Sequence, residues 1–259
     1  MIDNHIKIRY SNINNSEELS KALQGCEILL NIASLGFGAS ESILSACEKN
    51  KIKRAVFISS TSIFTHLNSI SKKTRTDAEE KVQSSKLCWT ILRPTMIYGS
   101  PSDRNIIKLI KWIDKIRILP IFGNGCSLQK PVHVKDVAWS VVKVINTKST
   151  FYRSFNISGA NPYTFNQVIN FTATALRKKV IKLYLPSKFF ELLLKCLEYL
   201  GIYLPIKSEQ IKRLNENKNF SNKEAREAFN FKPIDFEKGI QEEVELYKKK
   251  HKIINTKFN

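Results

Sequence analysis

The chain has 259 residues, of which 42% are hydrophobic and 25% charged, a balance that predicts a globular protein with one large domain or two small ones. It contains no run of about 18 apolar residues, and its first ten residues lack an apolar signal region, so neither a membrane-spanning helix nor a secretory leader is expected. Five scattered cysteines, none in C-x-x-C spacing, argue against a disulfide framework and against a metal site, and they favour a cytoplasmic location.

The basic excess is large, with a formal net charge of +19. Such a charge suits a nucleotide, an anionic membrane or a nucleic acid, and it also fits a general compositional bias towards lysine. The lysines are spread along the chain, and neither zinc-finger spacing nor an aromatic-rich RNA-binding signature accompanies them. Nucleic acid is therefore not expected as the partner. A nucleotide ligand, and peripheral contact with the inner face of an anionic membrane, stay open.

The first 150 residues alternate between the patterns of buried strands and amphipathic helices. Continuous apolar runs predict strands buried on both faces at residues 26–34, 53–60 and 88–93. Strands that alternate with helices indicate βαβ units, so the predicted fold class is α/β with a doubly wound parallel sheet. Helical spacing and capping residues such as Ser16 predict the helices, which are 16–25, 38–52, 76–86, 105–116 and 138–147.

After residue 150 the sequence becomes mainly helical. It ends in a Lys-rich tail for which no element is predicted. The predicted division is a first domain at 1–150 and a C-terminal lobe at 151–259, interleaved with the first. The elements predicted here are a strand at 151–158, a helix at 164–179 capped by Thr164, and polar helical sequence at 208–233.

The stretch 186–205 is strongly apolar and has lysine near both ends. One interpretation is a core helix of the C-terminal lobe. The other is a docking segment for an anionic membrane or an acidic partner, because an apolar helix flanked by lysine suits a lipid surface.

Two glycine pairs are candidate ligand loops. "GFGASE" at 36–41 follows a predicted strand and opens a predicted helix, as a dinucleotide-binding loop does, but it lacks the third glycine of G-x-G-x-x-G. It is therefore either a turn or a close approach of the backbone to a ligand. "FGNGCS", with Gly123 and Gly125, is typical of a plain turn.

Three segments occur in the order and spacing of a known family: "AVFISSTSIF", "WTILRPTMIYGSPSDRNI" and "PVHVKDVAWSV". Together they resemble the NAD-dependent epimerase/dehydratase family, the extended short-chain dehydrogenases, and most closely its nucleoside-diphosphate-sugar epimerase-like group. The resemblance covers about residues 8 to 245. It implies a Rossmann-like domain with a smaller substrate-side lobe, NAD or NADP as cofactor, and oxidoreductase or epimerase chemistry on a nucleotide-sugar.

The resemblance assigns roles to particular residues. Ser60 matches the catalytic Ser/Thr that hydrogen-bonds the reacting sugar oxygen, and Thr61 is its alternative by one position. The cofactor-binding positions that it implies are Asn31, Ala33, Ser34, Ser59, Arg75, Arg93, Pro94 and Thr95, and the substrate-binding positions are Tyr98, Arg104, Asn105 and His133.

Four of the matching side chains have structural interpretations as well. Ser60 is also explained as the residue that ends a strand. Arg93 is equally well explained as an ion-pair former, and His133 as a buried structural histidine. Asp136 is interpreted as the cap of the helix at 138–147.

The amino terminus departs from the family pattern. "IKIRYSNINNSEELSKAL" already resembles the third strand of the fold and the helix after it, so the glycine loop and the first βαβ elements are absent from this sequence. Without that loop the cofactor diphosphate lacks its usual helix N-terminus. A truncated product, a wrongly chosen start, and a chain that pairs with another copy or another protein are three explanations.

The second departure concerns the family's Tyr-x-x-x-Lys pair. Alignment on Ala78 and Glu79 places Ser71 at the tyrosine position and Arg75 at the lysine position. Serine is too weak an acid to replace tyrosine in proton transfer, whereas arginine can still hold a ribose hydroxyl or a phosphate. An inactive member that serves as a nucleotide-binding, assembly or membrane-associated accessory protein, or as a remnant, is therefore the alternative function.

Overall fold

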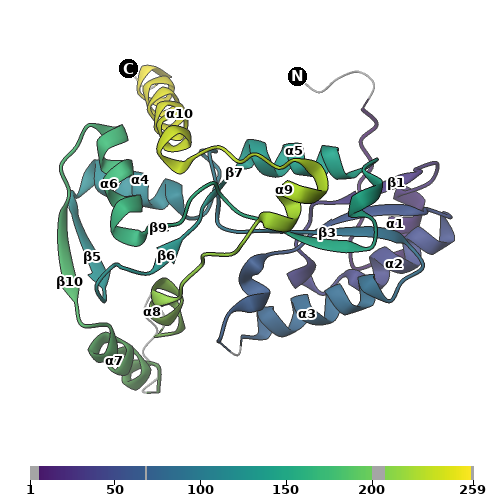
Figure 1. The fold of residues 1–259 in the computed structure, drawn as a ribbon, viewed down its shortest axis with the longest axis horizontal. Coiled ribbons are helices and arrows are strands. Elements are labelled where there is room, and N and C mark those ends of the chain that lie inside the picture. The colour runs from purple at the N-terminus through teal and green to yellow at the C-terminus, as the bar shows by residue number, and fades with distance from the viewer. Residues whose placement is uncertain (1–5, 68, 200–207, 258–259) are drawn as a thin grey trace. The chain divides into compact units, whose positions relative to one another are not determined.

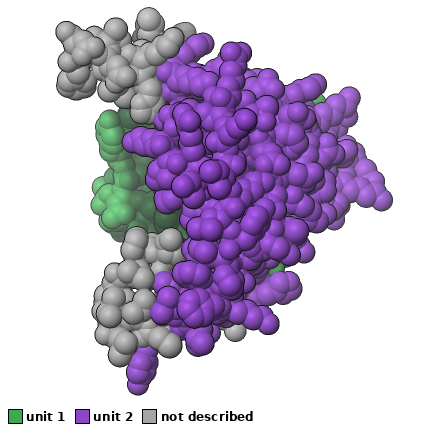
Figure 2. Space-filling model, turned by 90° about the vertical axis from the view of Figure 1, so that its left-hand side faces the viewer, with its two compact units in different colours: residues 1–64, 68–93, 141–155 green, residues 65–67, 94–140, 156–259 purple. Residues whose placement is uncertain are grey.

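The computed structural model describes residues 6–67, 69–199 and 208–257 (Figure 1). They form two compact units, coloured green and purple in Figure 2. Unit 1 comprises Met1–Phe64, Asn68–Arg93 and Val141–Phe155, and unit 2 comprises Thr65–Leu67, Pro94–Ser140 and Asn156–Asn259. The domain boundary predicted at residue 150 stays a prediction.

Unit 1 is built on a sheet with the strand order β1-β2-β3-β8. The first three strands pair in parallel, and Asn31 at the end of β1 lies opposite Phe57 of β2. This confirms the predicted α/β fold with a parallel sheet. The strands are β1 (Ile28–Asn31), β2 (Arg54–Ile58), β3 (Cys88–Pro94) and β8 (Arg153–Ile157), the last of which continues into unit 2.

Helices cover one face of this sheet. Phe57 and Ile91 pack there against Ile43 of α2 and Val82 of α3. On the other face the buried Arg54 donates to the carbonyl oxygens of Val144 (2.7 Å) and Ile145 (3.0 Å). The helical elements of unit 1 are α1 (Ser16–Ala22), α2 (Ser40–Lys49), α3 (Ile70–Gln83) and the 3₁₀ turns η1 (Leu35–Phe37), η2 (Thr61–Phe64) and η3 (Lys148–Thr150).

The structure differs from the predicted helix starts in unit 1. Asn15, not Ser16, caps α1, since its side chain accepts hydrogen bonds from the amides of Glu17 and Glu18. Helix α3 begins at Ile70, six residues before its predicted start, because Ser69 caps it by accepting from Lys72 N (3.2 Å). Residues 71–80, "SKKTRTDAEE", are therefore all helical.

The strand expected near the amino terminus is not formed. Residues 6–12 adopt no regular structure, and Tyr10 is exposed. A strand must pair its backbone groups with a neighbour, and the described residues provide no strand beside this segment. Strand β1 was also predicted to be buried on both faces, but Ile28 and Leu30 are partly exposed because β1 is the edge strand.

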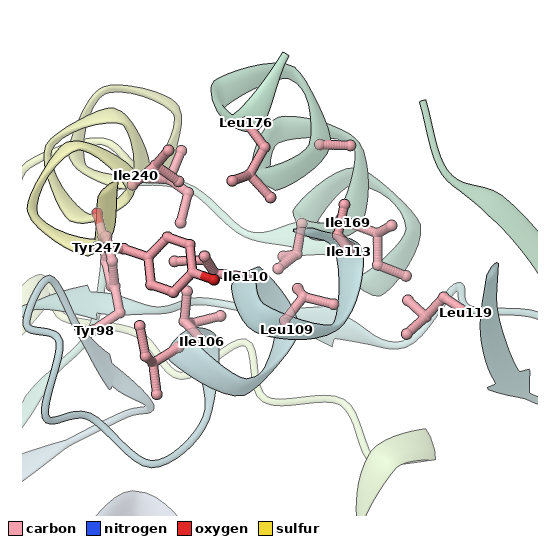
Figure 3. Packing of buried hydrophobic residues seen from close by; sticks show 14 of the residues in the cluster. Tyr98, Ile106, Leu109, Ile110, Ile113, Leu119, Ile169, Leu176, Ile240 and Tyr247 are labelled. Carbon is pink, nitrogen blue, oxygen red and sulfur yellow. The ribbon is translucent and has the colours of Figure 1, made fainter. Parts of the chain in front are cut away.

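Unit 2 has its own apolar core, formed where helices α4, α6 and α10 meet (Figure 3). Ile110 and Ile113 of α4, Ile169 of α6 and Ile240 of α10 are fully buried in it. The helix α10 was not predicted, since its sequence was interpreted as a Lys-rich tail. The predicted cap of α6 is confirmed, because Thr164 and Gln167 form a reciprocal capping box.

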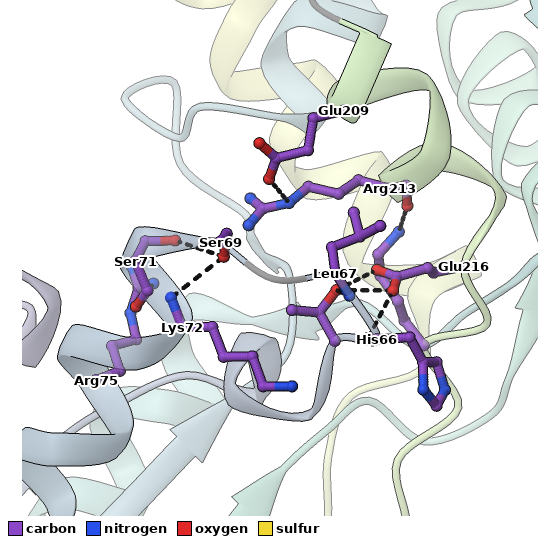
Figure 4. Close-up of polar contacts among 11 residues, drawn as sticks. His66, Leu67, Ser69, Ser71, Lys72, Arg75, Glu209, Arg213 and Glu216 are labelled. Atoms are coloured by element: carbon purple, nitrogen blue, oxygen red, sulfur yellow. Dashed lines mark hydrogen bonds and ion pairs between the residues drawn. The ribbon is translucent and has the colours of Figure 1, made fainter. Parts of the chain in front are cut away.

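The remaining elements of unit 2 are short strands and helices. The segment Thr65–Leu67 is fixed to this unit because the Glu216 carboxylate accepts from Thr65 Oγ1 (2.7 Å) and His66 N (3.0 Å) (Figure 4). The elements are β4 (Ile97–Tyr98), α4 (Ile106–Lys115), β5 (Ile118–Phe122), β6 (Leu128–Gln129), β7 (Val132–His133), α5 (Val134–Val144, shared with unit 1), β9 (Tyr163–Thr164), α6 (Phe165–Leu176), β10 (Ile181–Leu185), α7 (Ser187–Tyr199), α8 (Ser208–Asn215), α9 (Lys223–Phe229) and α10 (Phe236–Lys257).

The apolar stretch predicted at 186–205 forms α7 over its first part, and its end lies outside the described residues. Among the residues that the structure describes, no helix is long and apolar enough to cross a membrane.

Candidate functional site

The carboxyl ends of β1 and β2 meet at one edge of the sheet in unit 1, where ligands bind in open α/β folds. Ser59 follows β2 directly, and its amide donates to Leu92 O (2.8 Å). Its hydroxyl is buried and has no hydrogen-bond partner among the described residues. Ser60 is half-buried, and its Oγ accepts from Ser62 N (3.2 Å), while the buried Thr61 opens η2. The predicted catalytic hydroxyls therefore lie at this edge.

The segment after β1 folds back on itself at the same edge. Asn31 is buried, and its side-chain amide donates to Ala33 O (3.0 Å). Ser34 accepts from Gly36 N (3.1 Å) and so caps the 3₁₀ turn η1. Local hydrogen bonds thus hold the predicted cofactor-lining segment in one conformation.

Arg75 reaches this turn from α3. A Cβ atom at Gly36 would lie 2.9 Å from Arg75 Cζ, so only glycine leaves room for the guanidinium. Arg75 also donates to Ser71 O (3.0 Å), one helical turn earlier. "GFGASE" therefore forms a turn, η1, and Gly36 lies in close approach to an arginine side chain of the same unit; an approach to a ligand stays a prediction.

We call Asn31, Ser34, Ser59, Ser60 and Arg75 the strand-end cluster. Their features suit the ribose and nicotinamide part of a dinucleotide, because a buried hydroxyl without a partner and a guanidinium can both hydrogen-bond ribose and amide groups. The described residues contain no G-x-G-x-x-G loop to receive the diphosphate.

Ser71 lies in the first turn of α3, one turn before Arg75 (Figure 4). Its Oγ is 3.3 Å from Ser69 Oγ. A serine hydroxyl is intrinsically too weak an acid to replace a tyrosine in proton transfer near neutral pH.

Arg93 and the two residues after it take part in holding the fold. Arg93 Nε donates to Glu79 Oε2 (3.0 Å), a carboxylate that is almost fully buried, and its guanidinium lies 5.4 Å from the centre of the Phe64 ring. Pro94 ends β3 and is buried. Thr95, in unit 2, donates from Oγ1 to Lys130 O (2.6 Å).

Tyr98 and His133, predicted to bind substrate, are both buried in unit 2. Their rings meet edge to face at 5.1 Å, and Tyr98 also packs on Phe236 at 4.9 Å. Burial raises the pKa of Tyr98, so its hydroxyl stays protonated at neutral pH. Burial also lowers the pKa of His133, whose Nδ1 accepts from Lys135 N (3.2 Å), so the imidazole is neutral.

Arg104 and Asn105, the other predicted substrate residues, are exposed at the start of α4. The residue that organises this start is Asp103, which accepts from Asn105 N (2.7 Å) and Ile107 N (3.0 Å). An exposed arginine beside a helix N-terminus is a favourable position for an anion.

Glu243 of α10 is a buried carboxyl that sequence reasoning missed. It accepts from Gly99 N (2.8 Å). Burial, together with the neighbouring Asp103 carboxylate, raises the pKa of Glu243 to about 9. The signal was present in the sequence, because Phe236, Ile240 and Val244 recur with helical spacing and place position 243 beside a buried face.

Asp136 does not cap a helix. It lies inside α5, and its carboxylate accepts from Ile234 N (2.8 Å). Burial raises the pKa of Asp136, and the hydrogen bond from Ile234 partly offsets that effect.

Comparison with known proteins agrees with this description. Residues 2–117 match the model of a family described as NAD(P)H-binding. A chloroplast stem-loop binding protein of 41 kDa from Arabidopsis thaliana is 30% identical over 107 residues, which are 40% of this chain and 28% of that protein. The N-acetyl-α-D-glucosaminyl-diphospho-ditrans,octacis-undecaprenol 4-epimerase of Escherichia coli O157:H7 is 22% identical over 169 residues, 57% of this chain and 50% of that protein.

The fold has close counterparts among solved structures. A UDP-glucuronic acid 4-epimerase from Bacillus cereus, solved with UDP-glucuronic acid and NAD, superposes with a TM-score of 0.74 at 18% identity, over 96% of this chain and 83% of that one. In the curated relatives just named, the matched segments span half of the relative's length or less.

Residues 2–117 therefore resemble NAD(P)H-binding proteins, and the fold of the chain is of the Rossmann type found in the solved epimerase. Its fold is that of the NAD-dependent epimerases and dehydratases, the extended short-chain dehydrogenases, and the resemblance drawn from its three motifs is confirmed.

Proposed function

We propose that this chain binds NAD(P)(H) through the strand-end cluster and takes part in redox chemistry on a nucleoside-diphosphate sugar. The observation that carries the proposal is the position of Ser59 and Ser60 at the carboxyl end of β2 and of Arg75 beside the turn after the parallel strand β1, all inside the segment that matches the NAD(P)H-binding model. The nucleotide-sugar is favoured because the solved relative from Bacillus cereus holds UDP-glucuronic acid and NAD.

The roles proposed for the residues follow from their chemistry. Arg75 is charged at every physiological pH and would hold a ribose hydroxyl or phosphate oxygen. Ser60 would hydrogen-bond the sugar oxygen at the carbon that exchanges hydride. The cofactor, when bound, accepts and returns that hydride. Arg104, exposed at the start of α4, would attract the diphosphate of the sugar nucleotide.

Titration of the chain with NADH, followed by calorimetry or by nicotinamide fluorescence, tests the binding. Arg75→Met should weaken the binding of NADH by about tenfold to a hundredfold, because a charge-assisted hydrogen bond contributes about 1.5–3 kcal/mol to the binding free energy. Lys73→Met removes an exposed charge from the same helix and should leave the affinity unchanged. The proposal fails if the wild-type chain shows no NADH binding at millimolar concentration, or if both variants weaken it equally.

A second candidate is a nucleotide-binding accessory protein without turnover. The observation in its favour is Ser71, which by the alignment stands where the family has its tyrosine and lies in the first turn of α3 with its Oγ 3.3 Å from Ser69 Oγ. A relative of 25% identity over 57% of this chain, subunit 9 of the NADH dehydrogenase 1 alpha subcomplex of Arabidopsis thaliana, bears the name of a complex subunit.

Restoring the pair separates the two candidates. Under the accessory function, the wild-type chain binds NADH but does not interconvert UDP-sugars in the presence of NAD, and Ser71→Tyr combined with Arg75→Lys introduces measurable conversion. If NMR of the sugar shows that the wild-type chain converts UDP-sugars, the accessory function is excluded.

A further inference from the structure

The two-stranded sheet of unit 2 has an outer face that is apolar and exposed. Strands β5 and β10 run in parallel, with Ile118 opposite Ile181 and Pro120 opposite Leu183, so these side chains lie on one face. The alternate residues Leu119 and Ile121 are buried in the core. The inner face of this sheet is therefore covered along β5, and its outer face is exposed on both strands.

Helix α7, which follows β10, carries an apolar stripe that is exposed as well. Phe189, Leu192 and Leu193 recur at helical spacing and form one side of the helix. The buried Leu194 lies on another side of the helix. The normal arrangement of a surface helix, with its apolar stripe towards the core, is thus reversed at these positions.

The two apolar surfaces are linked by aromatic contacts. Phe122, on the outer face of β5, meets Phe190 of α7 at 5.5 Å, and Phe190 meets Phe189 at the same distance. We call the combined surface the β10–α7 face. Its six large side chains, each between 41 and 66% exposed, are Ile118, Ile181, Leu183, Phe189, Leu192 and Leu193. Contiguous apolar surfaces of this kind on soluble proteins mark sites of association.

The charge of the residues around the β10–α7 face indicates which kind of partner would cover it. Segments 114–122 and 177–199 together hold eight basic and three acidic residues, a net charge of +5. Lys188 and Lys195, seven residues apart, follow one side of the apolar stripe of α7 and are exposed, and Lys195 also pairs with Glu191 (3.4 Å). A second copy docked on this face would bring two surfaces of net charge +5 together, and they would repel each other. An anionic lipid surface, in contrast, attracts the face by about 1 kcal/mol for each basic residue near the surface.

We infer that the β10–α7 face docks this chain on the surface of an anionic phospholipid bilayer, with Leu192 and Leu193 entering the headgroup region and Lys188 and Lys195 contacting lipid phosphates. Over the described residues α7 runs for 13 residues, fewer than the about 20 of a membrane span, and its apolar stripe along one side suits a position in the interface. Lysine stems are long enough to place their charges at the phosphates while the leucines are buried. This inference is independent of the proposed function, since it involves no residue of the strand-end cluster.

Flotation of the full chain with vesicles tests the inference. The chain should float with phosphatidylcholine vesicles that contain phosphatidylglycerol, much less with pure phosphatidylcholine, and less as salt is raised. Leu192→Ser with Leu193→Ser should lower the partition coefficient by about tenfold or more, from the loss of two leucine contacts. Lys188→Glu with Lys195→Glu should lower it on the anionic vesicles only.

The matched control is Val142→Ser, which removes an exposed apolar side chain from α5 and should leave flotation unchanged. Circular dichroism and the unfolding midpoint should show that every variant is folded. The inference is overturned by absence of flotation, by equal flotation on both vesicle types, or by leucine variants that float like the wild type. A concentration-dependent dimer that the leucine variants dissociate would assign the face to a second copy instead. Loss of stem-loop RNA binding in the same variants, without vesicle binding, would assign it to RNA.

Discussion

Two groups of polar residues in this molecule contain similar chemical groups in opposite environments. The strand-end cluster of unit 1 lies where two parallel strands end, and Ser60 and Arg75 are only partly buried. In unit 2, Tyr98, His133 and Glu243 are fully buried, and Glu243 lies beside the carboxyl of Asp103. Hydroxyls and charged groups at the open edge are available to a ligand. In the buried cluster, the pKa values of Tyr98, His133 and Glu243 are shifted so that the neutral forms are favoured. These residues hold α10 against the loop after β4.

The difference shows that residue type alone does not define a site. Tyr98 is the phenol nearest in sequence to the family's active-site helix, yet its hydroxyl is so close to α10 that a Cβ at Gly239 would lie 2.2 Å from it. Ser59 and Ser60 are ordinary serines, but the ends of β2 and β3 place them at the edge where α/β proteins bind ligands. The proposed function therefore assigns binding to the strand-end cluster, and the buried cluster packs α10 against its neighbours.

The largest expected effect comes from the ion pair that supports the strand-end cluster. Arg93→Met leaves the Glu79 carboxylate buried without its partner, and breaking such a pair costs about 3–5 kcal/mol of unfolding free energy. Urea unfolding at neutral pH measures the loss. Replacing both residues, by Arg93→Met with Glu79→Met, should recover most of it. If Arg93→Met alone leaves the free energy of unfolding unchanged, Arg93 is not a structural residue, and its predicted role in binding the cofactor is favoured.

Glu243 gives the next effect, through pH. Unfolded glutamate loses its proton near its ordinary pKa of 4.5, whereas folded Glu243 keeps it up to about 9, so folding takes up a proton between these values. The contribution of Glu243 to stability is then largest below pH 4.5 and falls as pH rises towards its folded pKa, so the wild-type chain should lose part of this contribution between pH 6 and 8. Glu243→Gln keeps a neutral side chain and should remove this dependence on pH.

The control for Glu243 is Glu242→Gln. Glu242 is exposed, and its hydrogen bond to Lys135 lowers its pKa, so its contribution is complete above pH 4.5 and constant between pH 6 and 8. Unfolding midpoints at several pH values measure both variants against the wild type. Parallel pH profiles for wild type and Glu243→Gln would show that Glu243 is ionised in the folded chain.

A smaller effect is expected at the contact between Gly239 and Tyr98. Gly239→Ala places a methyl group against the Tyr98 hydroxyl, and such overpacking costs about 1–3 kcal/mol, less the gain of up to about 1 kcal/mol from alanine in a helix. Tyr98→Phe removes a buried hydroxyl that has no partner among the described residues, so it should be neutral or stabilising.

The double variant completes this test. Gly239→Ala should be tolerated better in the Tyr98→Phe background than in the wild type, as thermal unfolding would show. If Tyr98→Phe abolishes NADH-dependent turnover while leaving stability unchanged, Tyr98 belongs to the chemistry and the contrast between the two clusters is wrong.

Much of the fold could be predicted because local patterns and final environment agree in it. The apolar run at 53–60 became a fully buried strand, and Thr164 capped its helix as its spacing with Gln167 indicates. The strand expected in residues 6–12 failed because pairing depends on a neighbour that local sequence does not report. Helix α10 was missed because its lysines obscured the spacing of Phe236, Ile240 and Val244.

The candidate site was predictable only in part. The motifs identified Ser60 and Arg75, and both lie in unit 1. Ser60 is at the edge of the sheet, and Arg75 is beside the turn that follows β1. The packing of Arg75 on Gly36 is a tertiary contact between residues 39 positions apart, and no local pattern specifies it. Glu243 was hidden for a different reason, since glutamate is normally exposed and only burial by neighbouring elements changes its ionisation.

Hydrogen exchange with and without NADH tests most directly whether the strand-end cluster is the ligand-binding group. Amides in residues 31–38 and 59–64 should exchange more slowly when NADH is bound, because the turns that these segments form would contact the ligand. Amides of the buried cluster, in 97–103 and in the first half of α10, should be unaffected. Protection confined to α10 and the loop after β4, with none at the ends of β1 and β2, would contradict the account.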